Sequence, residues 1–159
     1  MTPMTQTQEQ ATRIQFPAEL LQLPGKSLGV SQWHRITQEQ VNLFADSTGD
    51  HQWIHVDPVR AAAGPFGRPI AHGYLTLALG PLLIAQTLHV EQLTAALNYG
   101  LNKVRFPTPV PVGSRLRGAV TLLSAQQRPA GIEAVFTVVY ELQGSDRPAC
   151  VAEFVAIYR

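Results

Sequence analysis

The chain has 159 residues, 45% of them apolar, and a formal net charge of +1 at pH 7. This length suffices for one domain with a real core, but not comfortably for two. A net charge near zero excludes the strong positive field of many nucleic-acid or membrane-surface proteins. The lone cysteine, Cys150, excludes an intramolecular disulfide framework and is expected to be a small buried residue.

The first residues are polar and rich in glutamine, without the basic and apolar regions of a signal peptide. We expect residues 1–15 to form a polar arm and residues 16–159 to form a single domain. The most apolar run, residues 75–88, is too short to cross a bilayer. The sequence thus predicts no membrane association and a cytoplasmic location.

Thr37 and Gln40 have the spacing of a capping box, which predicts a helix that begins after Thr37. Gly49 is expected to end this helix. Asp57 and Pro58 have the signature of an N-cap followed by the first residue of another short helix. The chain between Gly49 and Pro58 is not expected to be regular helix.

A helix that is apolar nearly all round begins at Gly73, which predicts a buried helix, with a kink at Pro81. Alternating strand patterns occupy residues 97–106, 115–123, 132–142 and 149–158, with a weaker one at 29–36. We predict an α+β fold in which an antiparallel sheet curls over the apolar helix. Such a layer leaves an exposed edge strand, so we expect a homodimer that covers it.

Asp50 and His55 are the candidate acid and base. A turn between Gly49 and Pro58 could bring both side chains to one point, as two groups that share a water require. A carboxylate can accept a proton from that water, and a histidine near neutrality can orient it. The alternative is that Asp50 caps local backbone and that His55 is a half-buried structural residue.

His51 and His55 also have the H-x3-H spacing of metal ligands. The helix that would put both rings on one face is not expected here, and there are no cysteines to complete a site. Asp57 is better explained as an N-cap. The sequence therefore predicts no metal.

His72 and Gly73 begin the apolar helix, where free backbone N–H groups favour a developing negative charge. Glycine lets a ligand approach the backbone closely, although Gly73 could equally serve close packing. For His72, a packed imidazole that ties down the loop is preferred over catalysis. The arrangement would suit a thioester carbonyl that becomes an enolate.

Lys103 and Arg105 lie near the end of a strand and could meet the phosphates of a nucleotide-like group, although a solvated strand edge explains them as well. Trp53 and Trp33 could line an acyl pocket or belong to the core. There is no phosphate-binding glycine loop, no serine nucleophile elbow and no basic-aromatic nucleic-acid pattern.

Three segments together resemble the MaoC-like hydratase family of hot-dog (R)-specific enoyl-CoA hydratases. They are Phe44-Ala45-x-x-x-Gly49-Asp50-x-x-x-Ile54-His55-x-Asp57, Ile70-Ala71-His72-Gly73 and Val104-Arg105-Phe106-x-x-Pro109-Val110-x-x-Gly113. The wording from Gly49 to His55 is most similar to single hot-dog members such as nodulation protein N.

The resemblance implies a hot-dog fold in which Asp50 and His55 are catalytic and the backbone of Gly73 stabilises the oxyanion. It implies syn hydration of a trans-2-enoyl thioester to an (R)-3-hydroxyacyl thioester, or the reverse. No metal or redox cofactor is implied, because coenzyme A, or an acyl carrier protein, is part of the substrate. Many family members have Asn-Pro where this chain has Gln52 and Trp53, which affects the expected acyl chain.

Two further functions are compatible with the same fold. One is an acyl-thioester binding protein without turnover, and the other is an acyl-CoA thioesterase. The pairing of Asp50 with His55 and the helix that starts after His72 favour the hydratase.

Overall fold

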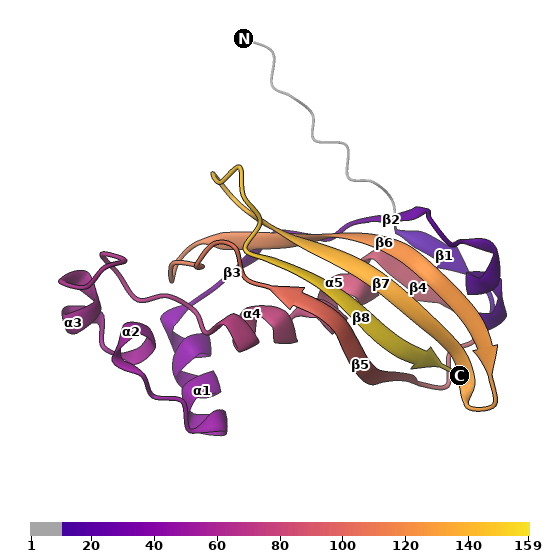
Figure 1. The fold of residues 1–159 in the computed structure, drawn as a ribbon, viewed down its shortest axis with the longest axis horizontal. Helices are drawn as coiled ribbons and strands as arrows, with labels where there is room; N and C mark the ends of the chain where they lie inside the picture. The colour runs from indigo at the N-terminus through magenta and orange to yellow at the C-terminus, as the bar shows by residue number, and fades with distance from the viewer. Residues whose placement is uncertain (1–10) are drawn as a thin grey trace, which may run out of the picture.

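A curved antiparallel sheet arches over a pair of short helices in the computed structural model, which describes residues 11–159 (Figure 1). The strands follow the spatial order β2-β6-β7-β8-β5, with β3 also paired to β6. Their bounds are Ser27–Val30 (β2), His34–Arg35 (β3), Ala96–Arg105 (β5), Arg115–Arg128 (β6), Gly131–Leu142 (β7) and Cys150–Tyr158 (β8). This is the predicted α+β arrangement.

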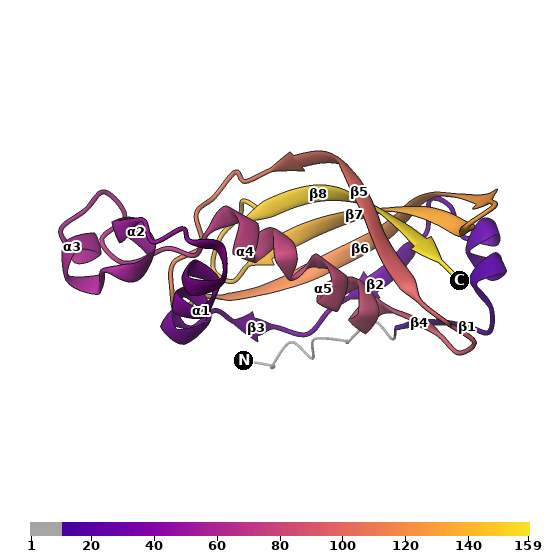
Figure 2. The ribbon, with the colours of Figure 1, turned by 90° about the horizontal axis from the view of Figure 1, so that it is seen from below.

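The helices under the sheet are α4, Gly73–Ala78, and α5, Gly80–Thr87. Seen from below, they run in succession across the sheet and end near β4 (Figure 2). The predicted kink is a complete break at Leu79, and Pro81 lies in the first turn of α5. There its missing N–H costs no helical hydrogen bond.

Close contact between the helices and the sheet explains why two positions are glycine. A side chain at Gly80 would collide with Phe154 and with the Tyr140 hydroxyl. The Tyr140 hydroxyl itself donates to the carbonyl of Leu77, 2.8 Å away, and so ties β7 to α4. A Cβ at Gly118 would lie 2.9 Å from the Cβ of Leu83.

One side of the α4–α5 pair is not covered, which differs from the prediction of a fully buried helix. Leu83 and Thr76 are buried, whereas Tyr74 is 72% exposed and Leu82 is 44% exposed. A single sheet can cover only one side of a helix. The apolar residues on the other side therefore remain exposed in the isolated chain.

The remaining elements flank this core. They are β1, Thr12–Ile14; the 3-10 helix η1, Pro17–Gln22; α1, Gln38–Thr48; α2, Trp53–Val56; α3, Pro58–Ala62; and β4, Leu88–Val90. Helices α1 to α3 project from one end of the sheet, and β1 and β4 lie toward the other (Figure 1).

Strand β1 changes the predicted domain boundary. It pairs in parallel with β4, and the side chain of Thr12 donates to the carbonyl of Leu28, 3.0 Å away. The folded domain therefore begins before residue 16, because a short strand within the predicted arm finds a partner 76 residues later, at Leu88. Residues 1–10 lie outside the described residues.

The predicted burial of the cysteine is confirmed. Cys150 is fully buried, and burial raises the pKa of its thiol to about 12. No helix within residues 11–159 combines the length and apolarity needed to cross a membrane.

Candidate active site

Asp50 is placed by the end of helix α1. The predicted capping box is present: Thr37 Oγ1 accepts from the N–H of Gln40, and Gln40 Oε1 accepts from the N–H of Thr37. Gly49 ends the helix in the left-handed region, with φ of 80°. The carboxylate of Asp50 then accepts a hydrogen bond from the N–H of Gln52 at 3.3 Å.

His55 lies on α2, a single helical turn, although no regular helix was predicted between Gly49 and Pro58. Two contacts hold this turn in place. Gln38 Nε2 donates to the carbonyl of His55 at 2.8 Å, and the N–H of Ile70 donates to the carbonyl of Ile54 at 3.0 Å. Neighbouring segments, rather than local helix propensity, therefore stabilise α2.

The imidazole of His55 has a defined tautomer. Its Nδ1 lies 2.7 Å from the carbonyl oxygen of Ile70. Since a carbonyl oxygen can only accept, Nδ1 carries the hydrogen and Nε2 keeps its lone pair. The residue is 6% exposed, and burial, with a further contribution from His72, lowers the pKa of His55. Nε2 is thus suited to accept a proton near neutrality.

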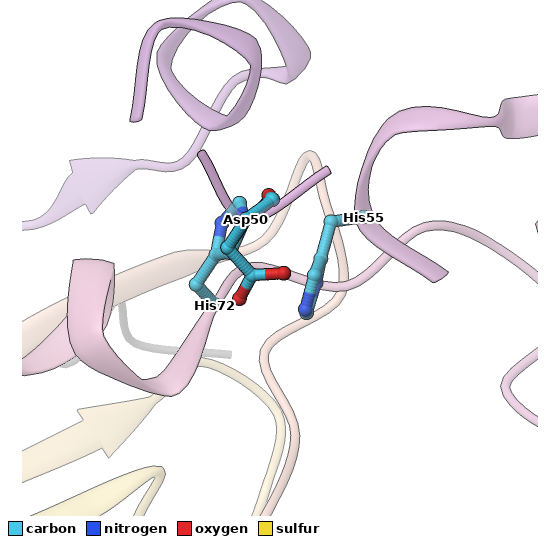
Figure 3. Close-up of side chains that lie close together, drawn as sticks. All are labelled: Asp50, His55 and His72. Carbon is cyan, nitrogen blue, oxygen red and sulfur yellow. The ribbon is translucent and has the colours of Figure 1, made fainter. Parts of the chain in front are cut away.

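His72 touches both predicted catalytic residues. Its Nε2 donates to the backbone carbonyl of Asp50 at 2.9 Å, and its ring stacks on that of His55 with centroids 3.9 Å apart. Phe44 of α1 packs against the same ring at 4.9 Å. Figure 3 shows the carboxylate of Asp50 directed toward the ring of His55, with His72 beside them. One potential ligand atom from each of the three residues lies within 4.8 Å of the others.

A cavity of about 230 Å³ adjoins this group. His55 lines it together with Gly73, the first residue of α4, and Phe106, which follows β5. A Cβ at Gly73 would lie 3.4 Å from the Phe106 ring, so the backbone of Gly73 faces a narrow space. Because the first N–H groups of a helix have no partner within it, this backbone can bind an anionic oxygen.

Gln52 and Trp53 do not line that cavity. Gln52 is exposed and contributes its backbone N–H to Asp50. The Trp53 ring lies 4.4 Å from the Arg60 guanidinium, and Gly64 packs against the same ring so closely that a Cβ there would lie 2.9 Å from it. In the isolated chain Trp53 therefore stabilises the projection formed by α2 and α3.

Lys103 and Arg105 are exposed near the end of β5 that leads to Phe106. Neither forms a salt bridge with another residue of the described range, 11–159. Their charges therefore face solvent close to the cavity-lining residue Phe106.

The three close side chains do not fit a shared metal ion. An imidazole nitrogen binds a metal along a lone pair in the plane of its ring, at about 2.0–2.1 Å for zinc. The rings of His55 and His72 are stacked with only 26° between their planes, so their lone pairs do not converge. His51, the other candidate ligand, is exposed and pairs with Asp46 at 2.9 Å.

Sequence reasoning missed two parts of the site. The carbonyl of Ile70, which fixes the tautomer of His55, is a main-chain group that gives no signal in the side-chain sequence. Phe106 was noted only as part of a motif, and its contact with Gly73 depends on the fold.

The chain is similar to known proteins. The profile of the family described as "MaoC like domain" matches residues 19–142. A 3-hydroxyacyl-thioester dehydratase Z of Mycobacterium tuberculosis is 56% identical over 142 residues, which cover 89% of this chain and 94% of that protein.

The chain belongs to the MaoC-like family.

This MaoC-like protein is also similar to two further proteins. Nodulation protein N of Rhizobium meliloti is 43% identical, with 88% of this chain and 89% of that protein covered. The solved (R)-hydratase of A. caviae, involved in PHA biosynthesis, is 27% identical with a TM-score of 0.69, over 84% of this chain and 97% of that one. This MaoC-like protein therefore has the hot-dog fold and is a hydro-lyase.

Proposed function

We propose that this protein is an (R)-specific enoyl-thioester hydratase. It adds water reversibly, in the syn sense, to a trans-2-enoyl thioester and forms an (R)-3-hydroxyacyl thioester. The observation that carries the proposal is the His55 imidazole, with its free Nε2 lone pair, beside Asp50 and next to the cavity that Gly73 lines. The names of the dehydratase and (R)-hydratase relatives support the same reaction.

Asp50 and His55 hold the reacting water between them in this proposal. As the water oxygen bonds to C3, the pair removes one proton, and the electrons of the C2–C3 double bond move toward the thioester oxygen. The N–H of Gly73 stabilises the resulting enolate oxygen. The pair then returns a proton to C2, and the thioester carbonyl forms again. In this mechanism, the transferred proton is assigned to the pair and not to one of the two residues.

Coenzyme A is the proposed carrier of the acyl group. Lys103 and Arg105 are exposed close to Phe106, where they can meet phosphate groups at the mouth of the site. Acyl carrier protein presents the same phosphopantetheine arm without the adenosine phosphates. A KM for the CoA thioester that rises when both residues become alanine, while the KM for the carrier-protein thioester does not, would support coenzyme A.

Two apolar spaces are proposed for the acyl tail, and the first begins at Tyr74, the residue that follows Gly73 in α4. A groove of about 390 Å³ begins at Tyr74, and a second cavity of about 310 Å³ lies between α5, β4 and β8. Pro81, Asn98 and Phe154 line both spaces, so the two adjoin. We assign the tail to this path rather than to Trp53, which packs on Arg60.

A second copy of the chain is the proposed partner of the exposed apolar face. Strand β5 is terminal in the described sheet, and its Tyr99 is 72% exposed. Tyr74 and Leu101 line the same groove as Tyr99. Pairing two β5 edges would cover both the strand and the uncovered side of α4, which a homodimer does with one self-complementary interface.

The test uses purified protein and crotonyl-CoA, with the conjugated enoyl-thioester absorbance and free thiol followed in parallel. We expect absorbance to fall without thiol release. In the reverse direction, (R)-3-hydroxybutyryl-CoA should regain the absorbance and the (S) isomer should not. Thiol release would identify a thioesterase, and binding without turnover would identify an acyl-thioester binding protein.

Asp50→Asn is the diagnostic variant, because the amide oxygen can still accept from the N–H of Gln52 while the general base is lost. We expect its rate to fall at least about 100-fold. Asp46→Asn is the matched control: Asp46 is an exposed aspartate of α1 that pairs with His51, and the change should leave the rate unaltered. Equal rates in both variants would refute the assignment.

A further inference from the structure

His72 is a buried histidine that the proposed reaction does not use. It is 2% exposed and does not line the cavity that His55 and Gly73 share. It contacts Asp50 through a hydrogen bond, His55 through ring stacking and Phe44 through a tilted ring contact. Its position between the two proposed catalytic residues suggests what it does.

We infer that His72 is a positioning residue that sets the backbone of Asp50 and the ring plane of His55 relative to each other. This inference rests on the proposed function. Asp50 follows the left-handed Gly49, and within residues 11–159 its carboxylate bonds only inside its own loop, to the N–H of Gln52. Among the described residues, the bond from His72 Nε2 is the one that ties the Asp50 carbonyl to a distant segment, 22 residues away.

The stacking of His72 on His55 restricts the orientation of the His55 ring. The bond from Nδ1 to the Ile70 carbonyl leaves the His55 ring able to pivot about that contact. The face of His72, 3.9 Å away, limits this rotation and keeps Nε2 directed at the water site. A misplacement of about 1 Å in such a pair can cost about 100-fold in rate.

The hydrogen-bond pattern separates positioning from proton transfer. Since Nε2 of His72 donates to a carbonyl, the neutral ring keeps its lone pair on Nδ1. That Nδ1 is buried and has no hydrogen-bond partner within residues 11–159. A proton there would have no acceptor, and it would place a charge against the stacked ring of His55. His72 therefore acts through its neighbours and not on the substrate.

Two substitutions divide the role into its parts. His72→Phe keeps a ring for the stack but removes the donor to the Asp50 carbonyl, and His72→Gln keeps an N–H donor but removes the ring. Ile132→Ala is the control for lost packing, because Ile132 is buried in β7 and pairs with Tyr158, at the opposite end of β8 from the cavity-lining Ala149.

Steady-state hydration of crotonyl-CoA is measured for all three variants, together with their melting temperatures. We expect His72→Phe to lower kcat about 10- to 100-fold with KM changed less than about threefold. We expect the kcat of His72→Gln to be about tenfold higher than that of His72→Phe. An Ile132→Ala variant of similar melting temperature should keep the kcat of the wild type.

The titration of His55 followed by NMR needs no substrate, so it separates failure of this inference from failure of the proposed function. Asp50 and His72 are the titratable groups that face His55. His72 contributes to the lowering of the His55 pKa, so its removal should raise the pKa of His55 in both variants. An unchanged His55 titration, a His72→Phe kcat within about twofold of the wild type, or an equal loss in Ile132→Ala would overturn the inference.

Discussion

The imidazoles of His55 and His72 stack with their centroids 3.9 Å apart, yet the hydrogen is on Nδ1 in His55 and on Nε2 in His72. His55 donates through Nδ1 to the carbonyl of Ile70, and His72 donates through Nε2 to the carbonyl of Asp50. Of the two rings, only that of His55 lines the cavity, and its free lone pair is on Nε2. In the proposed mechanism, His55 meets the reacting water and His72 holds its neighbours in place.

The rate should depend on pH through His55. Burial lowers its pKa from the usual 6.5, and the reaction needs its neutral form. We expect kcat/KM to rise with pH through a limb whose midpoint lies below 6.5, and then to stay level through neutrality. A pH profile with crotonyl-CoA checks this, and a midpoint above 6.5 would contradict it.

The same titration should affect stability. Between the native pKa of His55 and 6.5 the unfolded chain binds more protons than the folded one, so the unfolding free energy rises with pH. This contribution is complete above 6.5 and is lost as the pH falls through the native pKa. Urea unfolding of the wild type and of His55→Gln at several pH values measures it: the difference between them should shrink as the medium becomes acidic.

Gly73→Ala should separate activity from folding. The new methyl group would lie 3.4 Å from the Phe106 ring, which is an ordinary contact, and alanine favours helix more than glycine does. The melting temperature should therefore not fall. The methyl group would nevertheless occupy the narrow space beside His55, and we expect kcat/KM to fall at least about tenfold. An alanine variant with full activity would show that the substrate does not approach this backbone closely.

Gly80→Ala should destabilise the protein because its methyl group would meet the ring of Phe154 and would lie 2.6 Å from the Tyr140 hydroxyl. We expect a loss of about 1–3 kcal/mol in unfolding free energy, the usual cost of overpacking, measured by urea denaturation. Gly100→Ala in β5 is the control, since a Cβ there has nothing within 4 Å. Equal stability of the two variants would mean that the helix break can move away from the sheet.

Tyr99→Glu should weaken the proposed homodimer. It places a charge on the exposed apolar face of β5, where two copies would bring like charges together. We expect the dimer dissociation constant to rise at least about tenfold in sedimentation analysis. Val59→Glu is the control, because Val59 is 85% exposed but lies on α3, away from β5. If both variants sediment as the wild type does, the partner does not cover β5.

Local signals made much of the site predictable. The capping box at Thr37, the terminating Gly49 and the N-cap Asp57 each involve residues within a few positions of one another, and the structure contains all three. The alternation of apolar and polar residues located the long strands, because this pattern is also local in the sequence. These features placed Asp50 after a helix and Gly73 at the start of another.

Long-range contacts account for what sequence reasoning missed. The bond from His72 to Asp50 spans 22 residues, and the pairing of β1 with β4 joins Thr12 to Leu88. Neither leaves a periodic pattern. The apolar character of the helix after Gly73 was read correctly, but it could not reveal that one side of the helix is exposed in the isolated chain.

The carbonyls of Ile70 and Asp50 belong to the main chain, so no side-chain substitution at these two positions removes them. The backbone conformation therefore determines which nitrogen of each imidazole carries the hydrogen. The residues that line the groove and the cavity beyond Tyr74 are side chains, free to vary in size. In the proposed binding mode, reaction type and substrate range are therefore separable, and a library of substitutions along the acyl path should retune chain length while leaving the hydration chemistry in place.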